Sequence, residues 1–374
     1  MKKQHTNKKV DFLDGALVTL MAAMLLLFGI GFLLLPQKSF SESENRMLAI
    51  WEIPTWQSVS DGSFSEKLGK IFRDQFPLRP ALVATKAYGE ILLGKRENNR
   101  ILWGEEGYLM ARNEFSELSV AEENLRAVAD AKMTAVWIPR SADVMTEYLP
   151  SAYPSASANE LYRMIGENGT VPWQVLSSAV AQGRQVYYRT DHHLTTEGAY
   201  LIYCSLGEKL GYSPLSYDEF DRQTVSEDFR GSADSAVGGI APRADTIELF
   251  RYEGDADFRV IDRTTGEERE GFYDWSALEK KDQYSVFLGG NFAHLSISSS
   301  KEVKKPKLLL VKDSFANALI PFLAIHFDLE VVDLRYVTGS LWVEEYDCAL
   351  ILQGVDTLAT DPSLKKLDFL QKKS

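Results

Sequence analysis

Acid–base residues are concentrated in one short segment, 188-YRTDHHLTTEGAY-200, which lies between an apolar run and an expected helix. The chain has only five histidines, so two adjacent ones directly after an aspartate are unusual. Asp191, His192 and His193 can bind a metal, form the acid–base half of a catalytic site, or cap the following helix. The segment alone leaves these three chemistries open.

A second reactive group follows an aliphatic run in 308-LLLVKDSFANALIPFLA-324. The run predicts a strand, and a helical pattern begins directly after it, so Ser314 stands at a strand-to-helix turn. The amides of a helix N-terminus make this an oxyanion-binding position. A serine hydroxyl is a weak nucleophile and needs a histidine base that a carboxylate orients. His192 and His193, with Asp191, are therefore the candidate partners of Ser314.

Helix capping is the alternative at both places. A serine before a helix is commonly an N-cap. Asp191 and the threonines can cap a helix that starts near Thr196, where Glu197 complements the helix dipole. Spacing alone does not decide between capping and catalysis.

The elements that must position these residues alternate between strands and helices. Short apolar runs rich in β-branched and aromatic residues predict strands at 133–139, 185–189, 307–313, 330–336 and 347–353. The segments between them have the length and periodicity of helices. This alternation predicts an α/β fold with a mainly parallel sheet and helices on both faces. Reactive residues of such sheets lie at the carboxyl ends of the strands.

The chain from about 218 to 305 is too long for a single strand-to-helix connection. Its β-rich runs and turn residues predict an inserted antiparallel lobe that forms one wall of a substrate groove. Three aromatic side chains in it can stack on sugar rings, although aromatic residues at this density are more often core; they are Tyr273, Trp275 and Tyr284. The 230-RGSADS-235 loop is a further segment expected near the site.

Composition excludes one class of partner. The 374 residues are 45% hydrophobic and 25% charged, which suffices for one large core or two moderate ones in a globular protein. The net charge of −12 and the pI near 5.1 argue against nucleic acid as a partner. Phosphate contacts need clustered lysines and arginines.

The N-terminus predicts a membrane location. Four lysines precede an uncharged run at 16–35, which has about the 20 residues that a helix needs to cross a bilayer. We expect residues 1–15 in the cytoplasm and the chain beyond the span outside it. A cleaved signal peptide is the alternative, but its apolar region is usually about 7 to 15 residues long. Cys204 and Cys348 can form a disulfide in an oxidising compartment, but their apolar surroundings favour two buried thiols.

Residues 36–110 are expected to form a stalk and an N-terminal helical subdomain. Apolar residues recur at helical spacing within 64–94, and Pro77 is expected to divide this segment into two helices. The 101-ILWGEEGYLM-110 segment has the pattern of a hairpin. The main domain then spans 111–374.

Together these motifs resemble the DHHW family of SGNH-hydrolase-like cell-surface proteins, which is named for an Asp-His-His-Trp motif and related to the alginate O-acetyltransferase proteins of bacterial envelopes. The matching segments are 44-ENRMLA-49, 61-DGSFSEKLGKIFRDQFPLR-79, 190-TDHHLTTEGAY-200, 288-LGGN-291, 312-KDSFANALIPFLA-324 and 333-DLRY-336. Leu194 stands where the family has tryptophan. The resemblance implies a three-layer α/β/α SGNH-hydrolase-like domain.

The resemblance also implies roles for the site residues. Asp191 orients His193, His193 is the general base and acid, and Ser314 attacks the acyl donor. Side chains two residues apart in an extended segment lie on the same side. His192 then points the other way and is either structural or a substrate contact.

Oxyanion donors are expected on either side of the serine. The Ser314 amide supplies one donor. The candidates for the second are Asn291, the backbone of Gly290, and Asn317. The LGGN segment can also be no more than a tight turn.

The function predicted from the resemblance is acyl transfer. A membrane-anchored extracytoplasmic O-acyltransferase or esterase would move an acetyl group to or from a cell-surface polysaccharide through an ester of Ser314. No cofactor and no metal are expected, because His5, His294 and His326 lack the acidic clusters of a metal phosphoesterase. A membrane-bound acyl-donor exporter is a partner that only the resemblance implies. The alternative is a non-catalytic envelope protein that keeps the fold and binds glycan or assembly partners.

Overall fold

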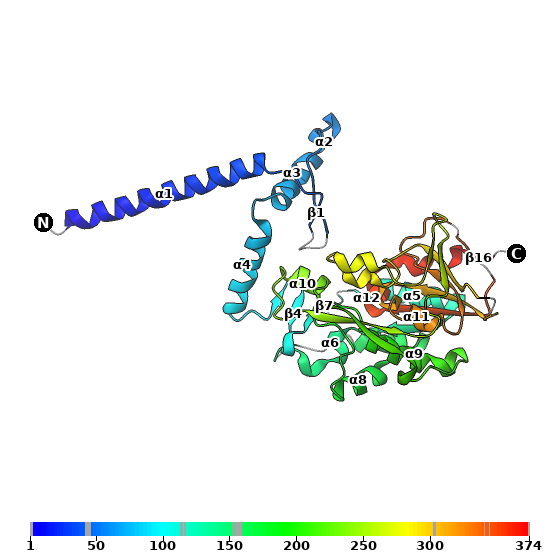
Figure 1. Ribbon diagram of the computed structural model, residues 1–374. Coiled ribbons are helices and arrows are strands. Elements are labelled where there is room, and N and C mark those ends of the chain that lie inside the picture. Colours follow the sequence, from blue (N-terminus) through cyan, green and yellow to red (C-terminus); the bar gives the residue numbers. More distant parts are fainter. Residues whose placement is uncertain are drawn as a thin grey trace. The chain divides into compact units, whose positions relative to one another are not determined.

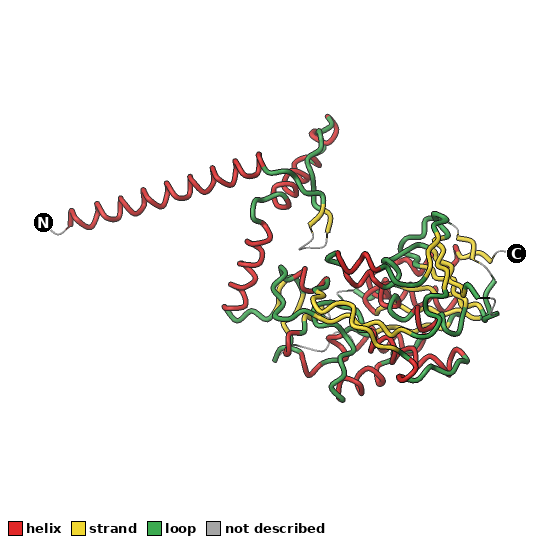
Figure 2. The backbone as a smooth tube through the Cα atoms, in the orientation of Figure 1, coloured by secondary structure: helices red, strands yellow, loops and turns green. Residues whose placement is uncertain are grey.

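The chain divides into two compact units, Met1–Leu93 and Gly94–Ser374. The computed structural model describes residues 3–41, 46–112, 115, 117–151, 153, 159–301, 304–339, 341–343 and 345–372. Figures 1 and 2 trace both units along the chain.

The first unit is helical and begins with the long helix α1 (Lys3–Leu34). Its Asp14–Leu34 part has 21 residues and a mean hydropathy of 2.6, so it is long and apolar enough to cross a membrane. A cleaved signal sequence meets the same criteria. Its end packs on the chain that follows, since Phe32 stacks on Phe72 with ring centroids 4.6 Å apart.

The remaining elements of the first unit are short. They are β1 (Phe40–Ser41), β2 (Arg46–Met47), α2 (Trp56–Ser60), α3 (Ser63–Asp74) and α4 (Arg79–Leu92). The expected helix break near Pro77 is confirmed, because α3 ends before it and α4 begins after it. β1 and β2 pair antiparallel. Asp74, at the end of α3, accepts hydrogen bonds from the Arg46 guanidinium of β2 and from the Ala49 amide that follows it.

The second unit is built on a seven-stranded sheet with the order β10-β9-β11-β13-β12-β15-β6. The strands are β6 (Thr134–Ile138), β9 (Phe258–Asp262), β10 (Glu268–Glu270), β11 (His294–Ser299), β12 (Lys307–Lys312), β13 (Asp328–Val332) and β15 (Cys348–Gly354). β13, β12, β15 and β6 run parallel, whereas β11, β9 and β10 add antiparallel pairs. The sheet is therefore mixed rather than mainly parallel, because three strands of the 218–305 insertion join it as an extension.

The strand predicted at 185–189 is wrong. Tyr187 forms an isolated bridge with Leu194, and the segment pairs with its own continuation rather than with the sheet. The Tyr188 amide donates to the His193 carbonyl at 3.2 Å, and the Thr195 amide donates to the Val186 carbonyl at 3.0 Å. The run is apolar because it is buried, and a short buried run does not reveal from its sequence whether it belongs to a sheet.

Both faces of the parallel strands are buried. On β12, Leu308 and Leu310 enter one hydrophobic cluster, whereas Leu309 and Val311 enter the other. Such alternation between two cores explains why these strands read as continuous aliphatic runs. The result is three layers, with helices on both sides of the sheet (Figure 2).

Different helices cover the two faces. The first face packs against α8 (Trp173–Ala181), α9 (Thr196–Leu210) and α11 (Ile320–Leu323). The second packs against α5 (Ser119–Ala131), α7 (Asn159–Asn168) and α12 (Val355–Thr360).

Smaller elements surround this core. The hairpin expected at 101–110 is confirmed as part of a three-stranded sheet. The smaller elements are β3 (Glu97–Asn98), β4 (Ile101–Trp103), β5 (Leu109–Ala111), α6 (Ser141–Val144), β7 (Asp221–Phe229), α10 (Ser232–Ala236), β8 (Asp245–Arg251), β14 (Leu341–Val343) and β16 (Leu370–Lys372). Cys204 and Cys348 are free thiols, and both are half-buried.

The close approach of α9 to the 186–194 segment gives a test of the fold. A Cβ on Gly198 would lie 2.3 Å from the Val186 carbonyl oxygen and 3.0 Å from a Leu194 methyl carbon. We expect Gly198→Ala to lower the free energy of unfolding by about 2 kcal/mol, as overpacked cores do. Urea unfolding of the full chain followed by tryptophan fluorescence measures this change.

The matched control is Gly166→Ala, a helical glycine of α7 with nothing within 4 Å of its added Cβ. It should be neutral or stabilising by about 0.5 to 1 kcal/mol, because alanine restricts the unfolded chain more than glycine does. Equal stability of the two variants would contradict the packing described for α9.

Candidate active site

The serine turn is built at the carboxyl end of β12. Asp313 caps the 3-10 helix Ser314–Ala316 by accepting a hydrogen bond from the Phe315 amide at 2.9 Å. Its second oxygen accepts from the Gly354 amide at 2.8 Å and from the Thr357 hydroxyl at 2.6 Å. The nucleophile candidate Ser314 is therefore held by contacts to the neighbouring strand end and to α12.

The histidine segment reaches the same place on a tight loop. The bonds between residues 186–188 and 193–195 close this loop, and Thr195 then caps α9 by accepting from the Gly198 amide at 3.2 Å. Capping and the histidine site thus use different residues of one segment. Leu194, in the place of the family's tryptophan, is fully buried against α9.

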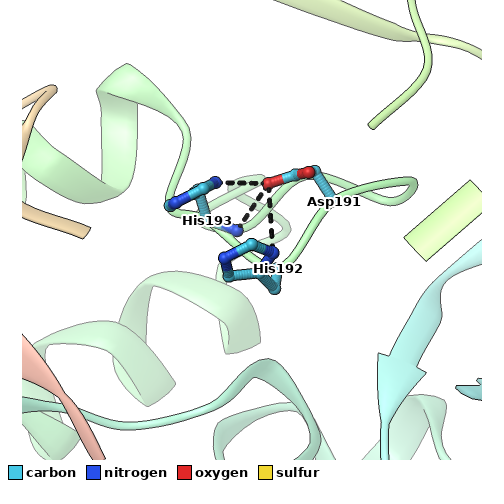
Figure 3. Close-up of side chains that lie close together, drawn as sticks. All are labelled: Asp191, His192 and His193. Atoms are coloured by element: carbon cyan, nitrogen blue, oxygen red, sulfur yellow. Dashed lines mark hydrogen bonds and ion pairs between the residues drawn. The ribbon is translucent and has the colours of Figure 1, made fainter. Parts of the chain in front are cut away.

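Three predicted residues form one continuous hydrogen-bonded chain. Asp191 Oδ1 lies 2.5 Å from His193 Nδ1, and His193 Nε2 lies 2.8 Å from Ser314 Oγ. The same carboxylate oxygen accepts from the His193 backbone amide at 3.0 Å. Figure 3 shows His193 and His192 on one side of this carboxylate, with interactions converging on a single oxygen.

The other oxygen of Asp191 is occupied by the 230–235 loop. Ser232 donates to Oδ2 twice, from its amide at 2.7 Å and from its hydroxyl at 2.8 Å. Burial alone would raise the pKa of Asp191, but the adjacent histidines and the hydrogen bonds from His193 and the Ser232 amide hold it well below its usual range. Asp191 is therefore a carboxylate at neutral pH.

The ring of His193 is fixed by an aromatic contact from the insertion. Tyr284 stacks on it with centroids 3.9 Å apart and planes inclined by 7°. The Tyr284 hydroxyl donates to the Ser314 carbonyl at 3.1 Å. Tyr284 is thus buried between histidine and serine and does not offer a face to a sugar.

The other two aromatic residues expected to stack on sugars lie elsewhere on the insertion. Trp275 is 47% exposed, and its ring centroid lies 6.0 Å from that of Tyr273. The Arg251 guanidinium lies over both rings. Trp275 is therefore the ring of this group that is open to solvent.

The expectation that His192 points the other way is wrong, because residues 191–193 form bends rather than an extended segment and place His192 beside His193. The two ring centroids are 3.9 Å apart, and His192 Nδ1 lies 2.7 Å from Ser232 Oγ. The side chain of His192 is 42% exposed, whereas that of His193 is 8% exposed. His192 is therefore the more accessible of the two rings.

The pocket beside Ser314 has a volume of about 310 Å³. Its walls combine the apolar strands β4 and β5 with polar groups from the loops at the sheet edge. The residues that line it are Ile101, Leu109, Ala111, His192, Ser232, Ala233, Asp313, Ser314, Phe315, Arg335, Asp356 and Thr357.

The predicted oxyanion residues surround a buried amine. Lys312 Nζ donates to Asn291 Oδ1 at 2.9 Å and to Asn317 Oδ1 at 2.8 Å. The Asn317 amide group lies 3.4 Å from the Gly290 carbonyl and 3.3 Å from Asn291 Oδ1. Because its oxygen is held by Lys312, Asn291 turns its NH₂ group away from the amine.

Lys312 is also balanced by a buried carboxylate. Asp333, fully buried, lies 3.8 Å from the Lys312 amine and accepts two hydrogen bonds from the Arg335 guanidinium. Burial lowers the pKa of Lys312 to about 8, although Asp333 acts in the opposite direction. The amine lies among three acceptors and can donate to all of them only in its protonated form.

Sequence reasoning named the 230–235 loop but not Ser232, and it did not recognise Lys312. Glycine is needed before Ser232, because a Cβ on Gly231 would lie 2.3 Å from both Cβ and Oδ2 of Asp191, but a glycine in a loop does not reveal from sequence which residue it approaches. For Lys312, no local pattern distinguishes a buried lysine at a strand end from an exposed one.

Comparisons with known proteins agree with this fold. The solved structures that are similar to the chain include the three described next. A DHHW family protein from Eubacterium siraeum matches with 18% identity and a TM-score of 0.59, over 74% of this chain and 98% of that one. PatB1 from Bacillus cereus, solved with a sulfonyl adduct, matches with 16% identity and a TM-score of 0.57, over 72% of this chain and 98% of that one. The O-acetyltransferase domain of Pseudomonas putida AlgJ matches with 17% identity and a TM-score of 0.42, over 70% of this chain and 93% of that one.

No curated protein matches the sequence. The family model of the DHHW protein matches residues 162–333, a range that contains Asp191, His193 and Ser314. The resemblance of this chain to the DHHW family is therefore confirmed.

Proposed function

We propose that the second unit is a serine-dependent O-acyltransferase or acetylesterase that acts on a cell-surface polysaccharide. The observation that carries the proposal is the chain from Asp191 through His193 to Ser314, with 2.5 and 2.8 Å between successive polar atoms. A base that is oriented by a carboxylate and bonded to a serine hydroxyl is the arrangement that activates serine. The polysaccharide and the acetyl group come from the family resemblance.

The first half-reaction forms an ester on Ser314. His193 Nε2 takes the hydroxyl proton while Oγ attacks the acyl carbonyl carbon. The resulting tetrahedral intermediate collapses, the bond from the carbonyl carbon to the leaving oxygen breaks, and His193 returns the proton to that oxygen. Asp191 stabilises the imidazolium that exists between these steps.

In the second half-reaction Ser314 Oγ, which attacked in the first, becomes the leaving oxygen. His193 takes the proton of an acceptor hydroxyl, which attacks the ester carbon, and the bond to Ser314 Oγ breaks. The proton then returns to Ser314. A sugar hydroxyl as acceptor makes the protein a transferase, and water makes it an esterase.

Oxyanion stabilisation is assigned to two groups. The Ser314 amide stands at the start of the 3-10 helix, where its hydrogen is directed outward from the turn. The Asn291 NH₂ group is the second candidate, because the Asn291 oxygen already accepts from Lys312 and the NH₂ group is left to donate elsewhere. Asn317 is less suitable, since its amide group faces Gly290 and Asn291.

The membrane location belongs to the same proposal. The Asp14–Leu34 helix serves as an anchor, and the second unit lies outside the cytoplasm, where it meets envelope glycans. An acyl-donor exporter in the same membrane would supply the donor, as the resemblance implies.

A metal site is the rival chemistry at these residues. Ligand atoms of Asp191, His192 and His193 lie within 4.8 Å of one another. Ligands of a tetrahedral zinc ion lie about 3.3 Å apart, whereas Asp191 Oδ1 and His193 Nδ1 are at hydrogen-bonding distance, 2.5 Å. Ser232 occupies the second carboxylate oxygen. The geometry favours the hydrogen-bonded chain.

The serine itself gives the first test. Ser314→Ala and His193→Ala should each lower the rate of p-nitrophenyl acetate turnover by at least about 10³-fold, as removal of triad members does. Phenylmethylsulfonyl fluoride should label the wild-type chain at Ser314 and neither variant. Mass spectrometry measures the label, and Ser178→Ala, an exposed serine of α8, is the matched control. Turnover and labelling equal to wild type in Ser314→Ala would refute the proposal, whereas wild-type turnover no higher than that of the two variants would favour the glycan-binding alternative.

The support of Asp191 can be tested without removing any polar group. The Cβ of Gly231→Ala must displace the Asp191 side chain, which lies 2.3 Å from the built position. We expect kcat to fall about 10²-fold, because a base misplaced by about 1 Å loses rate of this order. Circular dichroism and the urea midpoint report whether the fold is retained, and unchanged kcat would contradict the assigned role of this contact.

Metal removal separates the two chemistries. Dialysis against a chelator should leave esterase activity within about twofold of the untreated protein, because each proposed step uses side chains of this chain alone. If zinc restored an activity that the chelator had removed, the serine mechanism would have to be abandoned. Metal content before and after dialysis is measured by mass spectrometry.

A further inference from the structure

Ser232 links the carboxylate of Asp191 to the second histidine. Its Oγ lies 2.8 Å from Asp191 Oδ2 and 2.7 Å from His192 Nδ1, so one hydroxyl serves both groups. The Ser232 amide donates to the same carboxylate oxygen at 2.7 Å. The mechanism proposed above uses Asp191, His193 and Ser314 but gives no role to His192.

Counting protons fixes the tautomer of His192. An ionised carboxylate can only accept hydrogen bonds, so the single Ser232 hydroxyl proton must lie on the line to Asp191. The contact between Ser232 Oγ and His192 Nδ1 then needs the proton of the histidine. Neutral imidazole carries one N–H, and His192 Nε2 is therefore left with a lone pair.

His192 is neutral at physiological pH. Desolvation, together with the nearby His193, lowers the pKa of His192 from its usual value, and an ordinary histidine is already mostly neutral above pH 7. The lone pair on Nε2 is consequently present over the whole neutral range.

This lone pair faces away from Asp191. Figure 3 shows the two nitrogens of the His192 ring on opposite sides, with Nδ1 toward Asp191 and Nε2 away from it. Among the residues that the structure describes, no hydrogen bond to Nε2 is found. His192 is 42% exposed and lines the same pocket as Ser314.

The pocket matches one sugar-sized group. Its volume of about 310 Å³ lies at the lower end of small-molecule sites. One wall is apolar, from Ile101, Leu109 and Ala111, and His192 belongs to the polar side. A ring with an apolar face and hydroxyl groups at its edge fits both surfaces.

We propose that His192, held with its proton on Nδ1 by Ser232, accepts at Nε2 a hydrogen bond from a hydroxyl that neighbours the reacting hydroxyl of the acyl acceptor. This inference rests on the proposed function, because it concerns the acceptor of the Ser314 ester. The rings of His192 and His193 lie 3.9 Å apart, so they can meet two adjacent hydroxyls of one ring. The acceptor class is thus a vicinal diol, as in a sugar, rather than an isolated alcohol.

The preference for a vicinal diol over a single alcohol arises from one hydrogen bond. When a monohydroxyl acceptor occupies the pocket, the His192 lone pair is left without the donor it would otherwise meet. A lost hydrogen bond of this kind corresponds to about a tenfold change in the transfer rate. His192 is a specificity-determining residue under this proposal, whereas His193 remains the base.

The test compares matched acceptors and matched variants of the full chain in detergent. The acyl-enzyme is formed with p-nitrophenyl acetate and partitions between water and either trans-cyclohexane-1,2-diol or cyclohexanol. The ratio of ester product to released acetate is measured by gas chromatography. Wild type should prefer the diol about tenfold in transfer kcat/KM.

Two substitutions separate the two nitrogens of the ring. In His192→Asn the side-chain amide can still donate to Ser232 from the position of Nδ1, but no acceptor remains at the position of Nε2. The preference for the diol should therefore disappear. The amide oxygen of His192→Gln reaches the position of Nε2, so part of the preference should return. Equal preference for the diol in wild type and His192→Asn would overturn the proposal.

A second measurement does not depend on turnover. Long-range ¹H–¹⁵N correlation spectra of the histidine-labelled chain report the tautomer, and the two His192 variants assign its signals. We expect the Nδ1–H form and a shift of the Nε2 signal when the diol is added. The Nε2–H form, or a signal that the diol leaves unchanged, would contradict the inference even if the ester chemistry is sound.

The outcomes for the two proposals are distinct. If wild type releases nitrophenol no faster than Ser314→Ala, the proposed function fails, and the spectra still decide whether His192 accepts a hydrogen bond from the diol. If nitrophenol release depends on Ser314 but the diol and the alcohol are acetylated equally, only the role of His192 fails.

Discussion

A buried carboxylate stays ionised only if the protein supplies hydrogen-bond donors, and the ionised Asp191 is the group on which the geometry of this site depends. It is 4% exposed and accepts from four groups: the Ser232 amide and hydroxyl, and the His193 amide and ring. Each donor is thereby oriented in turn. The His193 ring must present Nε2 toward Ser314, and the Ser232 hydroxyl must leave its own lone pair toward His192. One desolvated charge therefore sets the direction of three side chains.

A second buried carboxylate, Asp313, orients the turn that carries Ser314. Asp313 receives donors from its own turn, from the end of β15 and from α12. Because β12 and β15 are adjacent parallel strands, their carboxyl ends are close enough for one side chain to join them. The sheet thus fixes Ser314, whereas the histidine loop is fixed by its own hydrogen bonds, by Ser232 and by Asp245, which accepts from the Arg189 and Thr190 amides. Ser314 and the histidine loop are thus held in place by different parts of the chain.

Much of this could be predicted from the sequence, for identifiable reasons. Strands buried on both faces read as continuous aliphatic runs, so β6, β12 and β15 were apparent, and the residue types of Asp191, His193 and Ser314 indicated their chemistry. Contacts between distant parts of the chain left no comparable signal. Ser232 lies 41 residues from the carboxylate it supports, and β9, β10 and β11 join the sheet through pairings that strand composition does not specify. The apolar run at 185–189 misled because burial and sheet membership produce the same composition.

The chain between the histidine loop and the serine cannot be regarded as a detachable module. Ser232, from near the start of the insertion, holds the carboxylate, and Tyr284, near its end, stacks on the His193 ring and donates to the Ser314 carbonyl. A chimera that exchanged this segment with a relative would exchange the support of His193 as well as the wall of the pocket. Under the proposed function, natural variation in the insertion would alter the reactivity of an unchanged Asp191–His193–Ser314 set, so that acceptor preference and the basicity of His193 would evolve together.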